Sequence, residues 1–204
     1  MRGVRRPDRQ GPAAGVPARD AVCHVQAARG ATLSRSGPSR LGIRLTALGI
    51  GLLGLGLDQL SKHAALANLE WGEPVNVLGP VLRFTLISNP GAAFGLGSGS
   101  TLALSIFAIL AFVASLVIAL PRITRMSHAV ALGLLLAGIT GNLHDRLLRD
   151  PSPLYGHVID FLQLPYFAIF NIADMCITAA AALIIILSFR HISDAAQEPE
   201  EAAA

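Results

Sequence analysis

The sequence predicts an all-α polytopic membrane protein with four transmembrane helices. The chain has 204 residues, of which 52% are hydrophobic and 14% charged, and its mean hydropathy is +0.56. A soluble domain usually carries about 25% charged residues. The chain contains four apolar stretches, each about 20 residues long, which is enough to span a hydrocarbon core of roughly 30 Å. A buried helical bundle in a soluble protein is disfavoured, because few charges separate the stretches.

The four stretches are similar in length, and each contains few charged residues. They run approximately over Leu45–Leu69, Thr101–Leu120, His128–Leu148 and Phe167–Phe189. Basic residues flank alternate ends of these stretches: Arg40 and Arg44, then Arg122 and Arg125, then Arg190. Because basic residues favour the cytoplasmic side, we expect both termini in the cytoplasm. Arg146 and Arg149 lie on the opposite side and require a local explanation.

Three further segments complete the expected organisation. Residues 1–41 hold eight Arg against Asp8 and Asp20 and are rich in Pro, Gly and Ala, which predicts a disordered leader. A translation start nearer Leu41 is an open alternative. Residues 42–190 form the membrane domain, and residues 191–204 form an acidic cytoplasmic tail. The net positive charge of the chain is confined to the leader, so we expect no nucleic-acid partner.

An extracytoplasmic β segment is expected within residues 70–98. Its centre, Pro74–Ile87, contains β-branched and aromatic residues interrupted by Gly79-Pro80. That pattern predicts a short hairpin lying on the outer membrane surface. The following stretch, Gly95–Gly99, is rich in glycine and predicts a loose loop.

Ionisable side chains within or beside the apolar stretches gather at one end of the predicted helices. They are Asp58, Lys62, Asp145, Arg146, Asp160 and Asp174. Such groups are costly in a membrane and mark functional sites. When two carboxylates lie close together they share a proton near neutrality, so one acts as a general base while the other polarises a carbonyl. The sequence therefore predicts aspartic-protease chemistry that needs no cofactor and no metal.

Other hydrolytic chemistries fit the residues less well. Cys176 lies inside the fourth stretch, and its nearest carboxylate in sequence, Asp174, faces another direction. Cys23 and Cys176 are far apart and give no disulfide framework. A zinc-binding His-Glu-x-x-His motif is not present in the sequence. His144 and His157 are interpreted as polar residues at the edge of the site.

Five ordered blocks resemble the signature of a known family. They are DQLSK (58–62), NPGAAFG (89–95), GNLHDR (141–146), VIDF (158–161) and FNIAD (170–174). In this order they resemble bacterial lipoprotein signal peptidase, also called signal peptidase II. The resemblance covers about Leu45 to Phe189. Members of that family remove the signal peptide of a prolipoprotein by cleaving just before a diacylglyceryl-modified cysteine, without a cofactor.

The resemblance also implies roles for individual residues. Asp160 and Asp174 would be the catalytic dyad. The supporting residues would be Asn89, Gly91, Asn142, Asp145, Arg146, Asn171, Asp58 and Lys62. Within this set, Asp145 and Arg146 are expected to pair or to order the helix end. Lys62 is expected to reach the membrane interface, while Asp58, one helical turn before it, would satisfy nearby backbone groups.

The resemblance further implies a multi-pass protein of the bacterial inner membrane, with its active site on the extracytoplasmic side. Its partners would be the lipid-modified substrate and membrane lipids, and we expect a monomer. Two alternatives come from other classes of protein. A small proton- or cation-coupled transporter subunit would place charges near the bilayer midplane and often shows an internal repeat. A non-catalytic scaffold would have little use for matched Asn-Asp motifs.

Overall fold

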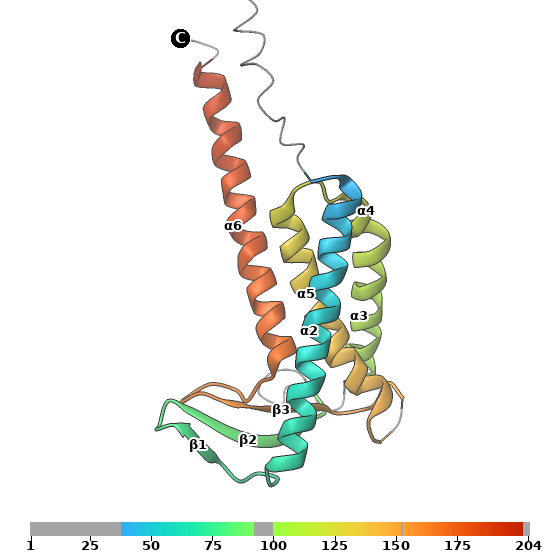
Figure 1. Ribbon diagram of the computed structural model, residues 1–204, viewed down its shortest axis with the longest axis vertical. Helices are drawn as coiled ribbons and strands as arrows, with labels where there is room; N and C mark the ends of the chain where they lie inside the picture. The colour runs from blue at the N-terminus through green and yellow to red at the C-terminus, as the bar shows by residue number, and fades with distance from the viewer. Residues whose placement is uncertain (1–37, 92–99, 152, 202–204) are drawn as a thin grey trace, which may run out of the picture. The chain divides into compact units, whose positions relative to one another are not determined.

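The computed structural model describes residues 38–91, 100–151 and 153–201, with side chains described as far as residue 190. In this part of the chain, four helices are long and apolar enough to cross a membrane, as the sequence predicted (Figure 1). They are α2 (Arg40–Asn68), the continuous run of α3 (Thr101–Ala114), η2 (Ser115–Ala119) and α4 (Leu120–Arg122), α5 (Met126–Leu148), and α6 (Ile172–Glu201).

Two helix starts differ from the sequence prediction. Helix α2 begins at Arg40, several residues before the predicted start, because the Ser39 hydroxyl accepts a hydrogen bond from the Gly42 N–H at 3.1 Å and caps the helix. The last residues assigned to the leader are therefore helical. Helix α6 begins at Ile172, five residues after the predicted Phe167, because Asn171 caps it. Residues 1–37 of the leader and the loop 92–99 lie outside the described residues.

Helix α5 lies at the centre of the bundle and packs against α2, α3 and α6. Of its most apolar 18 residues 56% are buried, against 22% or less for the other three candidate spans. The outer helices instead expose large apolar side chains such as Leu52, Phe107 and Phe189, which are 71%, 70% and 66% exposed. This arrangement suits a bundle whose outer surface contacts lipid rather than water.

Small residues allow the helices to approach closely. A methyl group on Gly54 of α2 would clash with Ala137 of α5, and one on Gly138 would lie 2.6 Å from the Ala173 carbonyl oxygen of α6. Helix pairs in membranes often associate through such small residues, since lipid supplies little hydrophobic drive for the pairing. The glycines therefore determine how near α2 and α6 come to α5.

Replacing Gly138 with Ala should destabilise the protein. The new methyl group would also meet the Ile177 side chain, so α5 and α6 would have to separate, at a cost of about 1–3 kcal/mol. Thermal unfolding in detergent should show a Tm several degrees lower. Gly49→Ala is the matched control, since nothing lies within 4 Å of that position. Equal Tm values for the two variants would show that the α5–α6 contact tolerates a larger separation.

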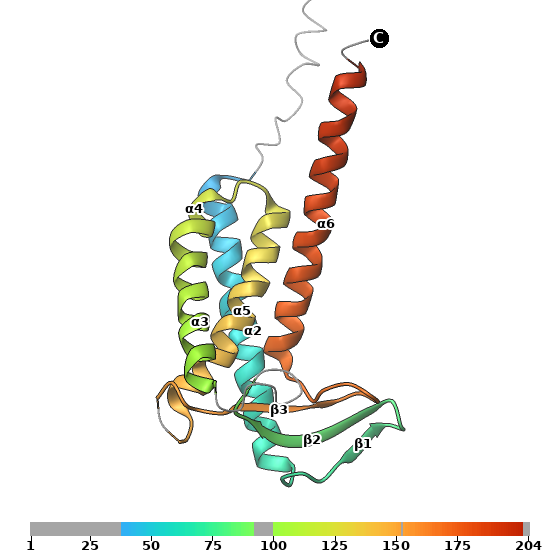
Figure 2. The same ribbon diagram turned by 180° about the vertical axis from the view of Figure 1, so that it is seen from behind.

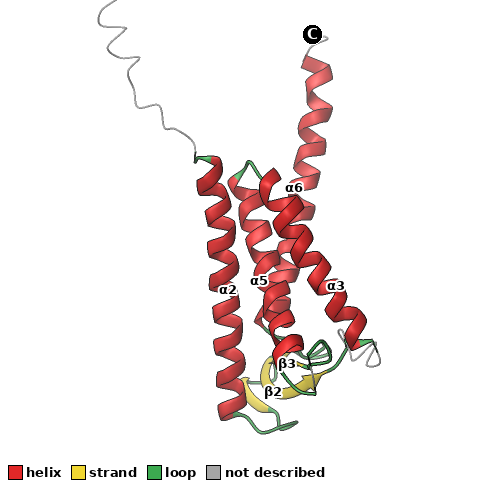
Figure 3. Cartoon of the chain, turned by 90° about the vertical axis from the view of Figure 1, so that its right-hand side faces the viewer, coloured by secondary structure: helices red, strands yellow, loops and turns green. Residues whose placement is uncertain are grey.

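A three-stranded antiparallel sheet covers one end of the bundle (Figures 2 and 3). Strands β1 (Val75–Leu78) and β2 (Leu82–Asn89) form the predicted hairpin around Gly79-Pro80. No strand was predicted after α5, yet β3 (Val158–Gln163) pairs with β2. Leu86, Ile159 and Phe161 pack against Ala65 near the end of α2 and form a small apolar core.

Candidate active site

The two predicted catalytic aspartates come from different elements, which meet where the sheet adjoins the start of α6. Asp160 lies in the middle of β3, and Asp174 lies in the first turn of α6. Between them the chain folds back on itself, because Leu162 and Phe170 exchange two backbone hydrogen bonds of 2.8 and 2.9 Å. This bridge brings the start of α6 next to β3, and so brings the two carboxylates into one site.

Asn171 joins the start of α6 to both carboxylates. Its side-chain oxygen accepts from the Asp174 N–H at 3.0 Å, while its own N–H donates to Asp174 Oδ2 at 3.2 Å. This reciprocal pair has the geometry of a helix capping box. Its side-chain amide also donates to Asp160 Oδ1 at 2.6 Å. One fully buried residue therefore caps the helix and holds both aspartates.

Two further amides complete the hydrogen bonding of the carboxylates. Asn89, the last residue of β2, donates to Asp160 Oδ2 at 2.8 Å. Asn142 of α5 donates to Asp174 Oδ1 at 2.8 Å and accepts from Asn171 at 3.1 Å. Each aspartate thus receives two side-chain or backbone N–H donors, which keeps both carboxyl groups in fixed orientations.

Asp160 is poised to hold a proton near neutral pH. Burial raises the pKa of Asp160 to about 7, and the neighbouring Asp174 adds to the rise, whereas the hydrogen bonds from Asn89 and Asn171 oppose it. An ordinary aspartate ionises near pH 4. A perturbed carboxyl group beside a second carboxyl group is an arrangement suited to general acid–base catalysis.

A cavity of about 730 Å³ opens from the aspartates along the bundle. Its walls come from α3, α5 and α6 and from the segment 167–170 that precedes α6. The apolar part is lined by residues such as Leu104, Phe107, Ile139, Phe170 and Ile177. The polar end holds Asn89, Asn142, Arg146, Asp160 and Asp174. The cavity can therefore accept an apolar chain and present its polar end to the two carboxylates.

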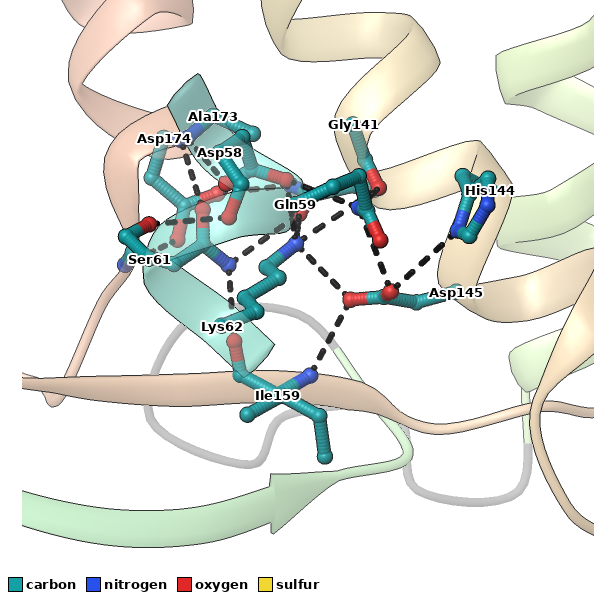
Figure 4. Close-up of polar contacts among 12 residues, drawn as sticks. Asp58, Gln59, Ser61, Lys62, Gly141, His144, Asp145, Ile159, Ala173 and Asp174 are labelled. Carbon is teal, nitrogen blue, oxygen red and sulfur yellow. Dashed lines mark hydrogen bonds and ion pairs between the residues drawn. The ribbon is translucent and has the colours of Figure 1, made fainter. Parts of the chain in front are cut away.

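A separate buried ion cluster lies beside the cavity without lining it (Figure 4). Lys62 is completely buried, and its ammonium contacts Asp58 Oδ2 at 2.8 Å and Asp145 Oδ2 at 2.7 Å. Arg149 also pairs with Asp145, at 2.8 Å. The four residues of this ion cluster are therefore distinct from the ionisable residues that line the cavity, which are Arg146, Asp160 and Asp174.

Comparison with known proteins identifies the family of the chain. Residues 50–190 match the family described as signal peptidase (SPase) II. The chain belongs to the signal peptidase II family. It is 44% identical over 151 residues to the lipoprotein signal peptidase of Leifsonia xyli subsp. xyli, which covers 72% of this chain and 68% of that one. It is 45% identical over 138 residues to that of Streptomyces coelicolor, covering 66% and 65%.

The fold is also similar to that of solved bacterial membrane enzymes. A bacterial membrane enzyme determined by the in meso method at 2.3 Å resolution superposes with a TM-score of 0.67 at 30% identity. The match covers 73% of this chain and 90% of that enzyme. Membership of a peptidase family contradicts the transporter and scaffold alternatives.

The structure brings every predicted site residue to the same end of the bundle, with two corrections to their expected partners. Asp145 pairs with Lys62 and Arg149, while Arg146 donates to the Gly91 carbonyl at 2.8 Å. The prediction that Asp145 and Arg146 pair was therefore wrong. Adjacent residues on a helix point about 100° apart, so they meet different neighbours. These contacts also explain why Arg146 and Arg149 lie at the end of the bundle where the positive-inside tendency predicts few basic residues.

Lys62 was predicted to reach the membrane interface, and that prediction was wrong. Two carboxylates hold its ammonium inside the bundle, and none of its side chain is exposed. Asp58 does satisfy a backbone group, since Oδ1 accepts from the Ala173 N–H at 2.9 Å. The sequence indicated the i,i+4 spacing of this pair but not the third partner from α5. Only the packing of α2 against α5 brings Asp145 to the ammonium.

Sequence reasoning missed two features of the site. Gln59 donates to the Gly141 carbonyl at 3.1 Å and lies close to the Asp58 and Asp145 carboxylates. Segment 167–170 lines the cavity rather than beginning the fourth helix. The Asn-x-x-Asp spacing at 171–174 is a helix N-terminus signal and could have located the start of α6.

The described residues offer no better hydrolytic constellation. Ser88 Oγ lies 2.8 Å from His157 Nδ1, but neither residue lines the cavity. Cys176 carries a free, partly buried thiol whose pairing with a base is not observed. Across residues 38–91, 100–151 and 153–190, no group of three or more His, Cys, Asp or Glu side chains is placed to hold a metal ion.

Proposed function

We propose that this protein removes signal peptides from diacylglyceryl-modified prolipoproteins, cutting just before the lipidated cysteine, with Asp160 and Asp174 as its catalytic dyad. The observation that carries the proposal is the position of the two carboxylates at the polar end of an apolar cavity. Apolar helix walls suit a signal helix and acyl chains. The carboxylates then lie where the polar junction of such a substrate would be.

The proposed chemistry uses one ionised and one protonated carboxyl group. The ionised carboxylate takes a proton from a water molecule, whose oxygen attacks the scissile carbonyl carbon. The protonated carboxyl group gives its proton to the carbonyl oxygen. As the tetrahedral intermediate collapses, the C–N bond breaks. The carboxyl group that took the water proton gives it to the leaving nitrogen, and the other carboxylate takes a proton from a hydroxyl group of the intermediate, which restores the starting state of the pair. The two carboxyl groups titrate as a pair, and no cofactor takes part.

We infer the membrane topology from the basic residues. The Arg44 guanidinium donates to the Pro121 carbonyl at 2.7 Å, so the start of α2 and the end of α4 lie at one end of the bundle, away from the sheet (Figure 1). Arg40, Arg122 and Arg125 belong to the same end. The positive-inside tendency supports a cytoplasmic location for it. The sheet and the dyad would then lie on the extracytoplasmic side of the bacterial inner membrane, with a monomer surrounded by lipid.

The direct test is cleavage of a purified prolipoprotein by the full chain in detergent, without added metal. We expect cleavage of the diacylglyceryl-modified substrate and little cleavage of the same polypeptide without the lipid. Because the pKa of Asp160 is about 7, kcat should fall about tenfold per pH unit at pH values well above 7, as the shared proton is lost. A folded wild-type protein that leaves the lipidated substrate intact would refute the proposed activity.

A further inference from the structure

The buried cluster of Asp58, Lys62 and Asp145 connects to the backbone beside each proposed catalytic residue. Asp58 Oδ1 accepts from the Ala173 N–H at 2.9 Å, and Ala173 directly precedes Asp174. On the other side, Asp145 Oδ2 accepts from the Ile159 N–H at 3.3 Å, and Ile159 directly precedes Asp160. The Lys62 ammonium joins the two carboxylates (Figure 4).

A third connection reaches the side chain of Asp174. The Lys62 ammonium lies 3.2 Å from Asn142 Oδ1 and so can donate to it. This leaves the Asn142 amide nitrogen turned towards Asp174 Oδ1, to which it donates at 2.8 Å. An ammonium has only donors, so a reversed amide would set donor against donor at Lys62. The lysine and the Asn171 amide, which both donate to Asn142 Oδ1, therefore fix which way Asn142 faces.

We propose that the Asp58–Lys62–Asp145 cluster is a clamp that sets the separation of the two proposed catalytic carboxylates by holding the backbone N–H group immediately before each. Its members are positioning residues, since none of them lines the cavity. Net stability is a poor explanation for such a cluster. The desolvation of buried charges commonly offsets their attraction, and apolar replacements of similar volume are often neutral or stabilising.

The clamp joins residues of four elements that meet beside the dyad. Asp58 and Lys62 belong to α2, and Asp145 belongs to α5. The two N–H groups belong to β3 and to the first turn of α6. Because a shift of about 1 Å at reacting groups can cost roughly 100-fold in rate, a rigid link between these four elements matters for catalysis.

The first test is Lys62→Met in the full chain, assayed with the lipidated prolipoprotein beside wild type. Loss of the link should lower kcat roughly 10- to 100-fold, as for residues that orient catalytic or metal-binding groups, with KM changed less than twofold. Arg149→Met is the matched control, because it removes an ion pair from Asp145 without breaking the connection through Lys62. We expect wild-type kcat for the control. Wild-type kcat for folded Lys62→Met would overturn the clamp.

The pH–rate profile separates positioning from a simple charge effect. Loss of a positive charge alone should move both limbs of the profile to higher pH by similar amounts. A larger separation of the carboxylates should weaken their mutual repulsion, so the two limbs should approach each other. We expect the narrower profile; an unchanged width would overturn the proposal.

Other ionisable groups around the aspartates are the same in Lys62→Met and in wild type. Helix α3 (Thr101–Ala114) contributes none. The remaining groups come from α2, from α5, from α6 and from the segment before β3, and they are Asp58, Asp145, Arg146, Arg149, Cys176, His144 and His157. A change in profile width therefore reports on the geometry of the pair.

A second variant covers the case in which Lys62→Met does not fold. Lys62→Met with Asp145→Asn removes one buried positive and one buried negative charge together, so the charge balance of the cluster is kept. It should fold and show the same loss of kcat and the same narrower profile. Unfolding of both variants would show that the cluster is required by the fold itself, and would overturn a role confined to the dyad.

The inference rests on the proposed function, and the experiment tells the two apart. Wild-type cleavage of the lipidated substrate reports on the proposed function alone. The comparison of Lys62→Met with wild type and Arg149→Met reports on the clamp alone. Active wild type with an unaffected Lys62→Met would leave the function standing and remove the clamp.

Discussion

Asp160→Asn and Asp174→Asn should each lower kcat by at least about 10³-fold while the protein stays folded. An amide cannot accept the proton of the attacking water, and loss of a general base costs up to about 10⁴-fold. The amide has nearly the shape of the carboxyl group, so the hydrogen bonds from Asn89 and Asn142 can be retained in part. Single-turnover cleavage of the lipidated prolipoprotein measures the effect.

Folding must be checked for both dyad variants, because each aspartate is hydrogen-bonded to its surroundings. Thermal unfolding in detergent gives that check. Asp150→Asn is the matched control, since it makes the same chemical change at an exposed residue outside the cavity. The control should keep wild-type kcat. If either dyad variant also kept it, the corresponding aspartate would be excluded from the chemical step.

Asn171→Leu should lower kcat by about 100-fold, the upper range for a residue that orients catalytic groups. Leucine has a similar volume but no donor or acceptor, so Asp160 would lose its 2.6 Å contact and the capping of α6 would be lost. The cap alone is worth about 1 kcal/mol. Because the two carboxylates then lack a shared partner, the fall in kcat should be larger than the small fall in Tm caused by loss of the cap would account for.

The control for Asn171→Leu is Asn68→Leu at the exposed end of α2, where the amide contacts only the Ala64 carbonyl at 2.8 Å. Initial-rate measurements at saturating substrate give kcat for both variants. We expect the control to match wild type within about twofold, as exposed substitutions away from special features usually do. A rate for Asn171→Leu within tenfold of wild type would show that Asn89 and Asn142 suffice to hold the carboxylates.

Much of the fold, and the end of the bundle at which the site lies, could be predicted from the sequence. The four long apolar helices and the hairpin at Gly79-Pro80 are local features, because hydropathy and turn residues act over short stretches of chain. The meeting of Asp58, Asp145, Asp160 and Asp174 at one end of the bundle also follows. The depths of the three helical aspartates can be counted from a helix end at 1.5 Å per residue, and Asp160 lies in the segment that joins the third and fourth apolar stretches at that end.

Tertiary structure decided which of these groups contact one another. Strand β3 was not predicted, and it forms where its backbone pairs with the edge of β2. Lys62 is buried because Asp145 arrives from another helix, and Arg146 faces Gly91 rather than its sequence neighbour. Helix periodicity predicts the direction in which a side chain points, but it does not predict which residue of another element will contact that side chain. The partners of buried charges therefore depend on packing, which no local pattern in the sequence records.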